Sequence, residues 1–134
     1  MPAQAAAPVY RTLGRTNLKA TALGFGCMLV SDSSVVARAL VMGLNFFDTA
    51  RSYQGDNNER MVGTVLKGLR KSVVLESKSA AKTRAEALAD LDTSLRELGT
   101  DYLDIWHLHD KNQPEEVSDD LLEAQRIAKQ AGKI

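Results

Sequence analysis

The stretch LNFFDTARSYQGDNNERMVGTVLKGL, residues 44–69, contains one complete strand–loop–helix unit. Its apolar start, Leu44–Phe47, predicts a short buried strand that Asp48 ends. Asn57 or Asn58 can cap the helix that follows, whose apolar side chains fall on one face: Met61, Val62, Val65, Leu66 and Leu69. The unit therefore predicts a strand covered by an amphipathic helix, with a polar residue where the strand meets the loop.

The same alternation extends in both directions from this unit. Further strands are predicted at Ala22–Met28, Ser72–Lys78 and Tyr102–Leu108. Further helices are predicted over Val35–Met42 after Ser33 or Ser34, from the capping box of Thr83 and Glu86 to Gly99, and from beyond Pro114 to Gly132. A turn-rich hairpin over Tyr10–Thr21 precedes them. Alternating strands and helices predict a parallel sheet, because each crossover needs a helix to cover the sheet.

A parallel sheet of this kind is either doubly wound or part of a barrel. The first strand–helix turn, GFGCML at residues 24–29, has two glycines but lacks the third of the G-x-G-x-x-G fingerprint. This turn argues against a dinucleotide-binding doubly wound fold. We therefore predict the α/β class and a parallel (β/α) barrel of the TIM type, with about four strand–helix units after the hairpin.

Composition excludes several classes of protein. The 134 residues carry 17 Lys and Arg against 17 Asp and Glu, so no charge excess favours nucleic acid or an anionic membrane. No run of about 18 apolar residues suggests a membrane span. The lone Cys27 excludes an internal disulfide and a thiolate metal cluster. The start, MPAQAAAPVY, lacks the features of a signal peptide, so we expect residues 1–9 to form a flexible tail and the protein to be cytoplasmic.

Polar side chains stand at the ends of three successive predicted strands. Asp48 follows the second strand, Lys78 ends the third and His109 follows the fourth, while Tyr53 lies in the loop after Asp48. In barrels, residues at the carboxyl ends of strands converge on one mouth, where chemistry occurs. A lysine ammonium near a tyrosine favours the phenolate, and an aspartate keeps the lysine charged. Such a group could protonate an oxygen that gains negative charge when a carbonyl carbon accepts hydride.

At these residues the sequence resembles the aldo-keto reductase family. LGRTNLKATALGFGCM is similar to the family's opening hairpin and first strand, and GLNFFDTARSY resembles its G-x-N-x-x-D-T-A-x-x-Y signature. NNERMVG is similar to the helix after that signature, SLRELGTDYLDIWHLH to the segment ending in the catalytic histidine, and AGKI to the lead into strand five. The motifs occur in the family's order from about residue 10 onward.

The resemblance implies a catalytic tetrad of Asp48, Tyr53, Lys78 and His109. In this family Tyr53 would be the general acid, Lys78 would tune it, Asp48 would support Lys78, and His109 would orient the carbonyl. The cofactor implied is NADPH or NADH, with Gly26, Cys27, Met28 and Asp48 near its nicotinamide end. The substrate implied is a small carbonyl compound. A complete barrel has eight strands and about 250 residues, so residues 10–134 are expected to form the N-terminal half of one.

Several alternatives remain open at this stage. Taken singly, Asp48 could be a turn residue, Lys78 a solvated strand end and His109 a structural histidine. The H-x-H of His107 and His109 is typical of metal-dependent hydrolases, although such sites need ligands from later strands; we predict no metal. The chain could also be an inactive fragment, or a half-barrel subunit that needs a complementary C-terminal half. Open edges of a half-barrel favour self-association. Glu76 and Asp104 are expected to pair with other groups or to face the ends of the barrel, and Trp106 to lie in the core or in the wall of a pocket.

Overall fold

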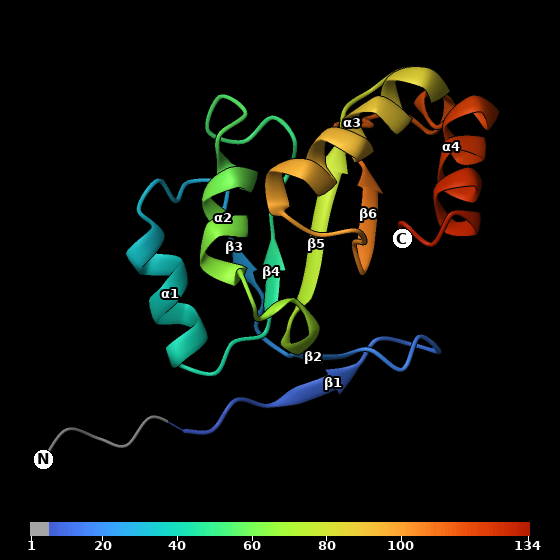
Figure 1. Cartoon of the computed structure of the whole chain (residues 1–134). Helices are drawn as coiled ribbons and strands as arrows, with labels where there is room; N and C mark the ends of the chain where they lie inside the picture. The colour runs from blue at the N-terminus through green and yellow to red at the C-terminus, as the bar shows by residue number, and fades with distance from the viewer. Residues whose placement is uncertain (1–5) are drawn as a thin grey trace, which may run out of the picture.

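The computed structural model describes residues 6–134. The predicted tail covers residues 1–9, of which residues 1–5 lie outside this range. At the last residue of that tail, the Val9 carbonyl oxygen accepts a hydrogen bond from the Ala22 amide (2.7 Å). The predicted hairpin is confirmed: β1 (Tyr10–Thr12) pairs antiparallel with β2 (Lys19–Thr21). This hairpin lies beneath the amino ends of the strands of the main sheet (Figure 1).

The main sheet has four parallel strands in sequential order, β3-β4-β5-β6. They are β3 (Phe25–Gly26), β4 (Phe46–Asp48), β5 (Val74–Ser79) and β6 (Ile105–Leu108). Between and after them come α1 (Ser33–Val41), α2 (Asn58–Leu66), α3 (Arg84–Leu98) and α4 (Asp119–Gln130). Two short 3₁₀ turns, η1 (Arg70–Ser72) and η2 (Pro114–Glu116), precede β5 and α4. The sequential order with a helix after each strand confirms the predicted (β/α) arrangement.

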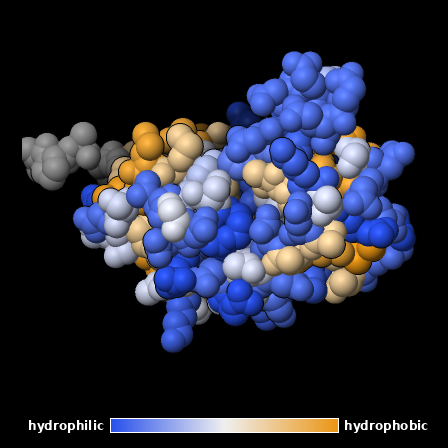
Figure 2. Space-filling model, turned by 90° about the horizontal axis from the view of Figure 1, so that it is seen from above, coloured by the Kyte–Doolittle hydropathy of each residue, from blue (hydrophilic) through white to orange (hydrophobic). Residues whose placement is uncertain are grey.

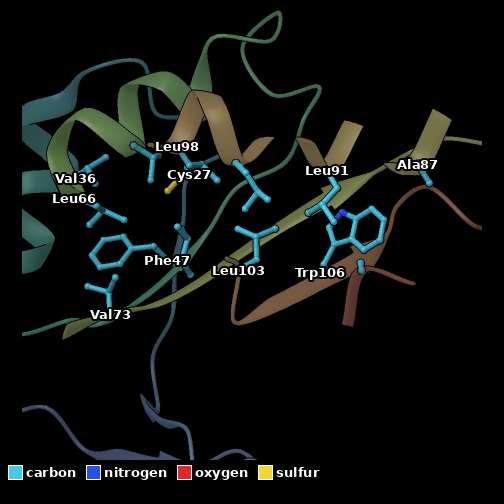
Figure 3. Close-up of a cluster of buried hydrophobic side chains, with 14 of the residues drawn as sticks. Cys27, Val36, Phe47, Leu66, Val73, Ala87, Leu91, Leu98, Leu103 and Trp106 are labelled. Carbon is cyan, nitrogen blue, oxygen red and sulfur yellow. The ribbon is translucent and has the colours of Figure 1, made fainter. Parts of the chain in front are cut away.

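Consecutive helices pack side by side, so the helices form one outer layer around a curved sheet (Figure 1). The handedness of parallel crossovers explains why they all fall on one face. Most strand side chains that point to this layer are apolar and meet the helices in a single core, as Figure 3 shows for Phe47, Leu66, Leu91 and Leu98. Ser77 and Ser79 of β5 are exceptions, and their hydroxyls donate to Glu59 of α2 and Asp90 of α3. Trp106 lies in this core, 5% exposed, as predicted. The opposite, inner face carries polar side chains toward the carboxyl ends of the strands and apolar ones, such as Phe46 and Val74, at their amino ends.

Element boundaries differ from the predictions where side chains compete for the backbone. The N-cap of α1 is Asp32, not a serine, because its carboxylate accepts from the Ser34 amide at 2.8 Å. The helix α2 ends at Leu66, three residues before the predicted apolar stripe does, because Gly68 adopts a left-handed conformation (φ 79°). The strand β6 begins at Ile105 instead of Tyr102, because the Leu103 amide bonds to the Lys133 carbonyl and leaves the ladder.

The start and end of α3 follow the sequence signals. Thr83 and Glu86 form the predicted capping box, and Gly99 ends the helix in the left-handed region (φ 66°). Within residues 6–134, no helix combines the length and the apolar character needed to cross a bilayer.

Candidate active site

The carboxyl ends of the strands form the edge on which the predicted site residues lie. Asp48 is the last residue of β4, Lys78 is the penultimate residue of β5, and His109 directly follows β6. Tyr53 lies in the loop that joins β4 to α2. Figure 2 looks onto this edge and shows a largely hydrophilic surface over the strand ends, with apolar side chains toward both the left and the right of the view. One edge of the sheet therefore presents all four side chains.

Lys78 is the centre of the contacts among them. Its ammonium forms an ion pair with the Asp48 carboxylate and donates to the Thr49 carbonyl oxygen at 2.9 Å. The same Nζ lies 3.4 Å from the Tyr53 hydroxyl. The Tyr53 ring in turn meets the His109 ring edge-on, with centroids 5.6 Å apart. The structure thus brings Asp48, Tyr53, Lys78 and His109 into one connected group.

The charge on Lys78 is held by its partners. Burial lowers the pKa of the ammonium, but the hydrogen bond and charge of Asp48, together with Tyr53, more than offset this, so the pKa lies above its usual value. The Lys78 side chain is 11% exposed, whereas that of its partner Asp48 is 39% exposed, so water reaches the ion pair from the Asp48 side. Lys78 therefore presents a fixed positive charge to the Tyr53 hydroxyl.

The described residues give neither ring nitrogen of His109 a hydrogen bond. Its Nδ1 is buried and has no hydrogen bond, and its Nε2 stands 3.6 Å from the Asp110 carboxylate, beyond hydrogen-bond distance. The side chain is 20% exposed at the mouth. A polar ring that has no strong protein partner is able to bind an oxygen of a ligand.

A cavity of about 330 Å³ opens beside this group. It is lined by the four residues expected to contact a cofactor, Gly26, Cys27, Met28 and Asp48, together with Leu29 and Tyr53. A Cβ on Gly26 would meet nothing within 4 Å, so the backbone here is open to a close planar neighbour. The cavity therefore brings the residues predicted to contact a cofactor and the Tyr53 phenol around one space.

Asn58 is a structural residue of the site that the sequence indicated only as a possible helix cap. Its buried amide accepts from the Thr49 hydroxyl at 2.6 Å and donates to the carbonyl oxygens of Cys27 (2.9 Å) and Val30 (3.0 Å). Its backbone amide donates to the Tyr53 carbonyl at 3.3 Å. Asn58 therefore joins the loop that carries Tyr53 to the loop that lines the cavity.

Glu59 is a second residue that the sequence did not single out. Its side chain is fully buried and forms an ion pair with Arg51, and its other oxygen accepts from the Ser77 hydroxyl at 2.6 Å. The Gln54 amide also donates to the Met28 carbonyl at 2.7 Å. The Tyr53 loop is thereby tied to β5 and to the loop after β3, which fixes the phenol relative to Lys78.

The H-x-H pair is divided between two environments. His107 Nε2 lies 3.4 Å from the Glu76 carboxylate, whereas His109 packs on Tyr53. In the part of the chain that the structure describes, no three His, Cys, Asp or Glu side chains gather as metal ligands would. Asp104 pairs with Arg70 at 2.7 Å, so both acids within the predicted strands have basic partners, as expected.

Cys27 is expected to resist alkylation in the folded protein. Burial, with the charge of Asp48 adding to it, raises the pKa of this thiol to about 12, against smaller opposing effects of Lys78 and a backbone hydrogen bond. The thiolate is the reactive form, so iodoacetamide at pH 8.5 should label Cys27 slowly when folded and fully in urea, as mass spectrometry would show. The stability that the buried thiol contributes is complete below its ordinary pKa and is lost as the pH rises toward 12. Equal labelling rates with and without urea would contradict the expected protection of Cys27 in the folded protein.

Comparison with known proteins gives a consistent result. The family model described as "Aldo/keto reductase family" matches residues 27–134. L-galactose dehydrogenase of Arabidopsis thaliana is 33% identical over 92% of this chain and 45% of its own length, and the uncharacterized oxidoreductase YqkF of Bacillus subtilis is 28% identical over 92% and 46%. The chain spans about half the length of these curated relatives.

Solved structures agree with the sequence comparisons. The holo form of an aldo-keto reductase from Bacillus halodurans superposes with a TM-score of 0.80 at 32% identity, over 95% of this chain and 48% of that one. An aldo/keto reductase from Klebsiella pneumoniae, solved with NADP and acetate, gives 0.76 at 30% identity, over 88% and 44%. The chain thus corresponds to less than half of each of these two proteins.

Proposed function

The chain belongs to the aldo/keto reductase family, and on this premise we propose that it serves the NADPH- or NADH-dependent reduction of aldehydes or ketones, with Tyr53 as the proton donor. One observation carries the proposal: the Tyr53 hydroxyl lies 3.4 Å from an ammonium that is itself ion-paired with Asp48. This is the arrangement that a weak acid needs to release a proton at neutral pH, because the ammonium stabilises the phenolate that remains.

The residues of the cavity fit the nicotinamide end of the cofactor. The relative from Klebsiella pneumoniae was solved with NADP, and in this chain the open backbone at Gly26 admits a flat ring that a larger side chain would hinder. Met28 and the fully buried Cys27 supply an apolar wall next to Tyr53. When bound there, the cofactor would supply hydride to the carbonyl carbon.

The side chains of this protein then act on the carbonyl oxygen. His109, whose ring packs edge-on against the Tyr53 ring, would orient that oxygen beside the Tyr53 hydroxyl. Tyr53 would protonate the oxygen as negative charge develops on it, and the fixed charge of Lys78 would stabilise the resulting phenolate. Asp48 would keep Lys78 charged and in place.

A second candidate is a half-barrel subunit that binds cofactor only with a complementary half. The observation that favours it is that β3 and β6 each pair on one side only within the described residues. The experiment that tests both candidates is a fluorescence titration of NADPH, followed by reduction of a generic aldehyde. Binding and turnover by the pure chain would support the first candidate. Binding that requires an added polypeptide carrying the remaining half of a relative would support the second, and binding in neither case would contradict both.

The two outer strands also predict the behaviour of the isolated 134-residue polypeptide. Parallel strands with unpaired backbone groups tend to pair with other chains, and apolar side chains such as Leu23 (70% exposed) and Val41 (75% exposed) lie on the β3 side of the molecule. We expect the purified polypeptide to self-associate through these edges. Size-exclusion chromatography with light scattering measures this directly, and a compact monomer at all accessible concentrations would contradict the prediction.

A further inference from the structure

Two ionisable residues that the proposed mechanism does not use lie on the same face of the sheet as Lys78. Glu76 precedes Lys78 by two residues in β5, and His107 in β6 is the register partner of Lys78. Side chains two residues apart in a strand point to one face, as do those of aligned neighbours in a parallel sheet. Asp48 is likewise the register partner of Glu76. Four ionisable groups on three neighbouring strands therefore share the inner face.

These groups form a continuous series of contacts from solvent to the Tyr53 phenol. His107, with a side chain 50% exposed, places Nε2 at 3.4 Å from Glu76 Oε1. The same Glu76 oxygen lies 3.8 Å from Lys78 Nζ, and the Glu76 side chain is only 9% exposed. Lys78 then reaches Asp48 and Tyr53. A change in charge at His107 is therefore three contacts away from the proposed proton donor, with Glu76 and Lys78 between them.

The balance of charge gives this series a consequence. Two carboxylates, those of Asp48 and Glu76, face the single ammonium of Lys78, which is paired with Asp48. A carboxylate as buried as that of Glu76 needs further compensation, and the neighbour able to provide it is His107 when protonated. Burial raises the pKa of Glu76; His107 opposes this rise, Asp48 adds to it and Lys78 opposes it. The Glu76–His107 pair thus retains or loses one proton beside Lys78.

We propose that Glu76 and His107 are positioning residues for Lys78, and that the proton on this pair sets how strongly Lys78 acts on Tyr53. With the pair protonated, the imidazolium neutralises Glu76, and the ammonium is directed to Asp48 and Tyr53. With the proton lost, the Glu76 carboxylate competes for the ammonium and draws it away from the phenol. The effect of raising the pH is therefore to weaken the contact of Lys78 with Tyr53. Its catalytic consequence rests on the proposed function, but the coupling within the series does not.

The test measures Lys78 directly by NMR in the full chain. Its side-chain Nζ and Cε signals are assigned by their loss in Lys78→Arg and followed against pH in the wild type, Glu76→Gln and His107→Gln. In the wild type they should move with the same pH midpoint as the His107 imidazole signals. Both variants should abolish this movement, and Glu76→Gln should also lower the pKa of Lys78. Glu123→Gln, which removes a carboxylate paired with Arg126 on α4, is the matched control and should leave Lys78 unchanged.

Turnover provides the second measurement. If the protein reduces an aldehyde, kcat in the wild type should fall as the pH rises through the same midpoint. This pH-dependent fall in kcat should be absent in Glu76→Gln, with KM unchanged. Lys78 signals that ignore both substitutions in folded protein would overturn the inference. Coupled Lys78 signals without any turnover would leave the inference standing and count against the proposed function instead. Should Glu76→Gln fail to fold, the exposed His107→Gln provides the same comparison.

Discussion

Replacing Tyr53 with phenylalanine is expected to lower kcat for aldehyde reduction by roughly 10²–10⁴-fold, because it removes the proposed proton donor. The ring itself should remain in place. It packs edge-on against His109 and lies 5.0 Å from the Lys78 ammonium, and phenylalanine retains both contacts. The Asn58 bond to the carbonyl of residue 53 involves only the backbone and is also retained. The affinity for NADPH should therefore change little while turnover is nearly lost.

The matched control is Tyr102→Phe. Tyr102 lies under the Arg70 guanidinium, 3.9 Å from it, at the amino end of β6 and away from the mouth. The Tyr102→Phe variant lacks the corresponding hydroxyl group but should keep wild-type turnover. Steady-state kinetics and NADPH titration are measured in whichever preparation shows activity, the chain alone or the chain with a complementary half. A Tyr53→Phe protein that retains more than about a tenth of the wild-type kcat would contradict the proposed role, since even a modest general acid contributes more.

Three of the four proposed catalytic residues could be placed from the sequence because a simple geometric rule governs them, and the fourth, Tyr53, lies in the loop that follows one of them. Parallel strands deliver their carboxyl ends to one edge, and Asp48, Lys78 and His109 each follow or end a recognisable apolar run. The hairpin, the capping box of α3 and the alternation of strands with helices along the chain rest on equally local signals. Local sequence patterns were therefore sufficient to predict those features that depend on residues close together in the chain.

The residues that hold the site together depend on contacts between distant segments, which a single sequence does not reveal. Asn58 follows Asn57, and either can cap a helix; only the packed structure shows that the Asn58 amide turns inward to bond with Cys27 and Val30. Glu59 sits in a first helical turn, where acidic residues are common on the surface, yet it is fully buried against Arg51. The brevity of β3 is equally non-local, since ladder length depends on the neighbouring strand.

Gly63→Ala is expected to reduce the free energy of unfolding by about 2 kcal/mol or more, through overpacking between α2 and α3. A Cβ at position 63 would lie 2.6 Å from both the Cα and the carbonyl oxygen of Leu98, closer than real Cβ contacts allow. These are backbone atoms and cannot rotate away, so the two helices must separate and loosen a core that includes Val62 and Leu66. In an exposed helix the same substitution would stabilise the protein by up to about 1 kcal/mol, so the sign of the effect distinguishes close packing from helix propensity.

Urea unfolding followed by circular dichroism measures this change in the free energy of unfolding. The control is the exposed Thr64→Ala on the same helix, which is expected to stay within about 0.5 kcal/mol of the wild type. A Gly63→Ala protein as stable as the wild type would show that α2 and α3 do not approach this closely. The burial of Asn58 and Glu59 on α2 would then need another explanation.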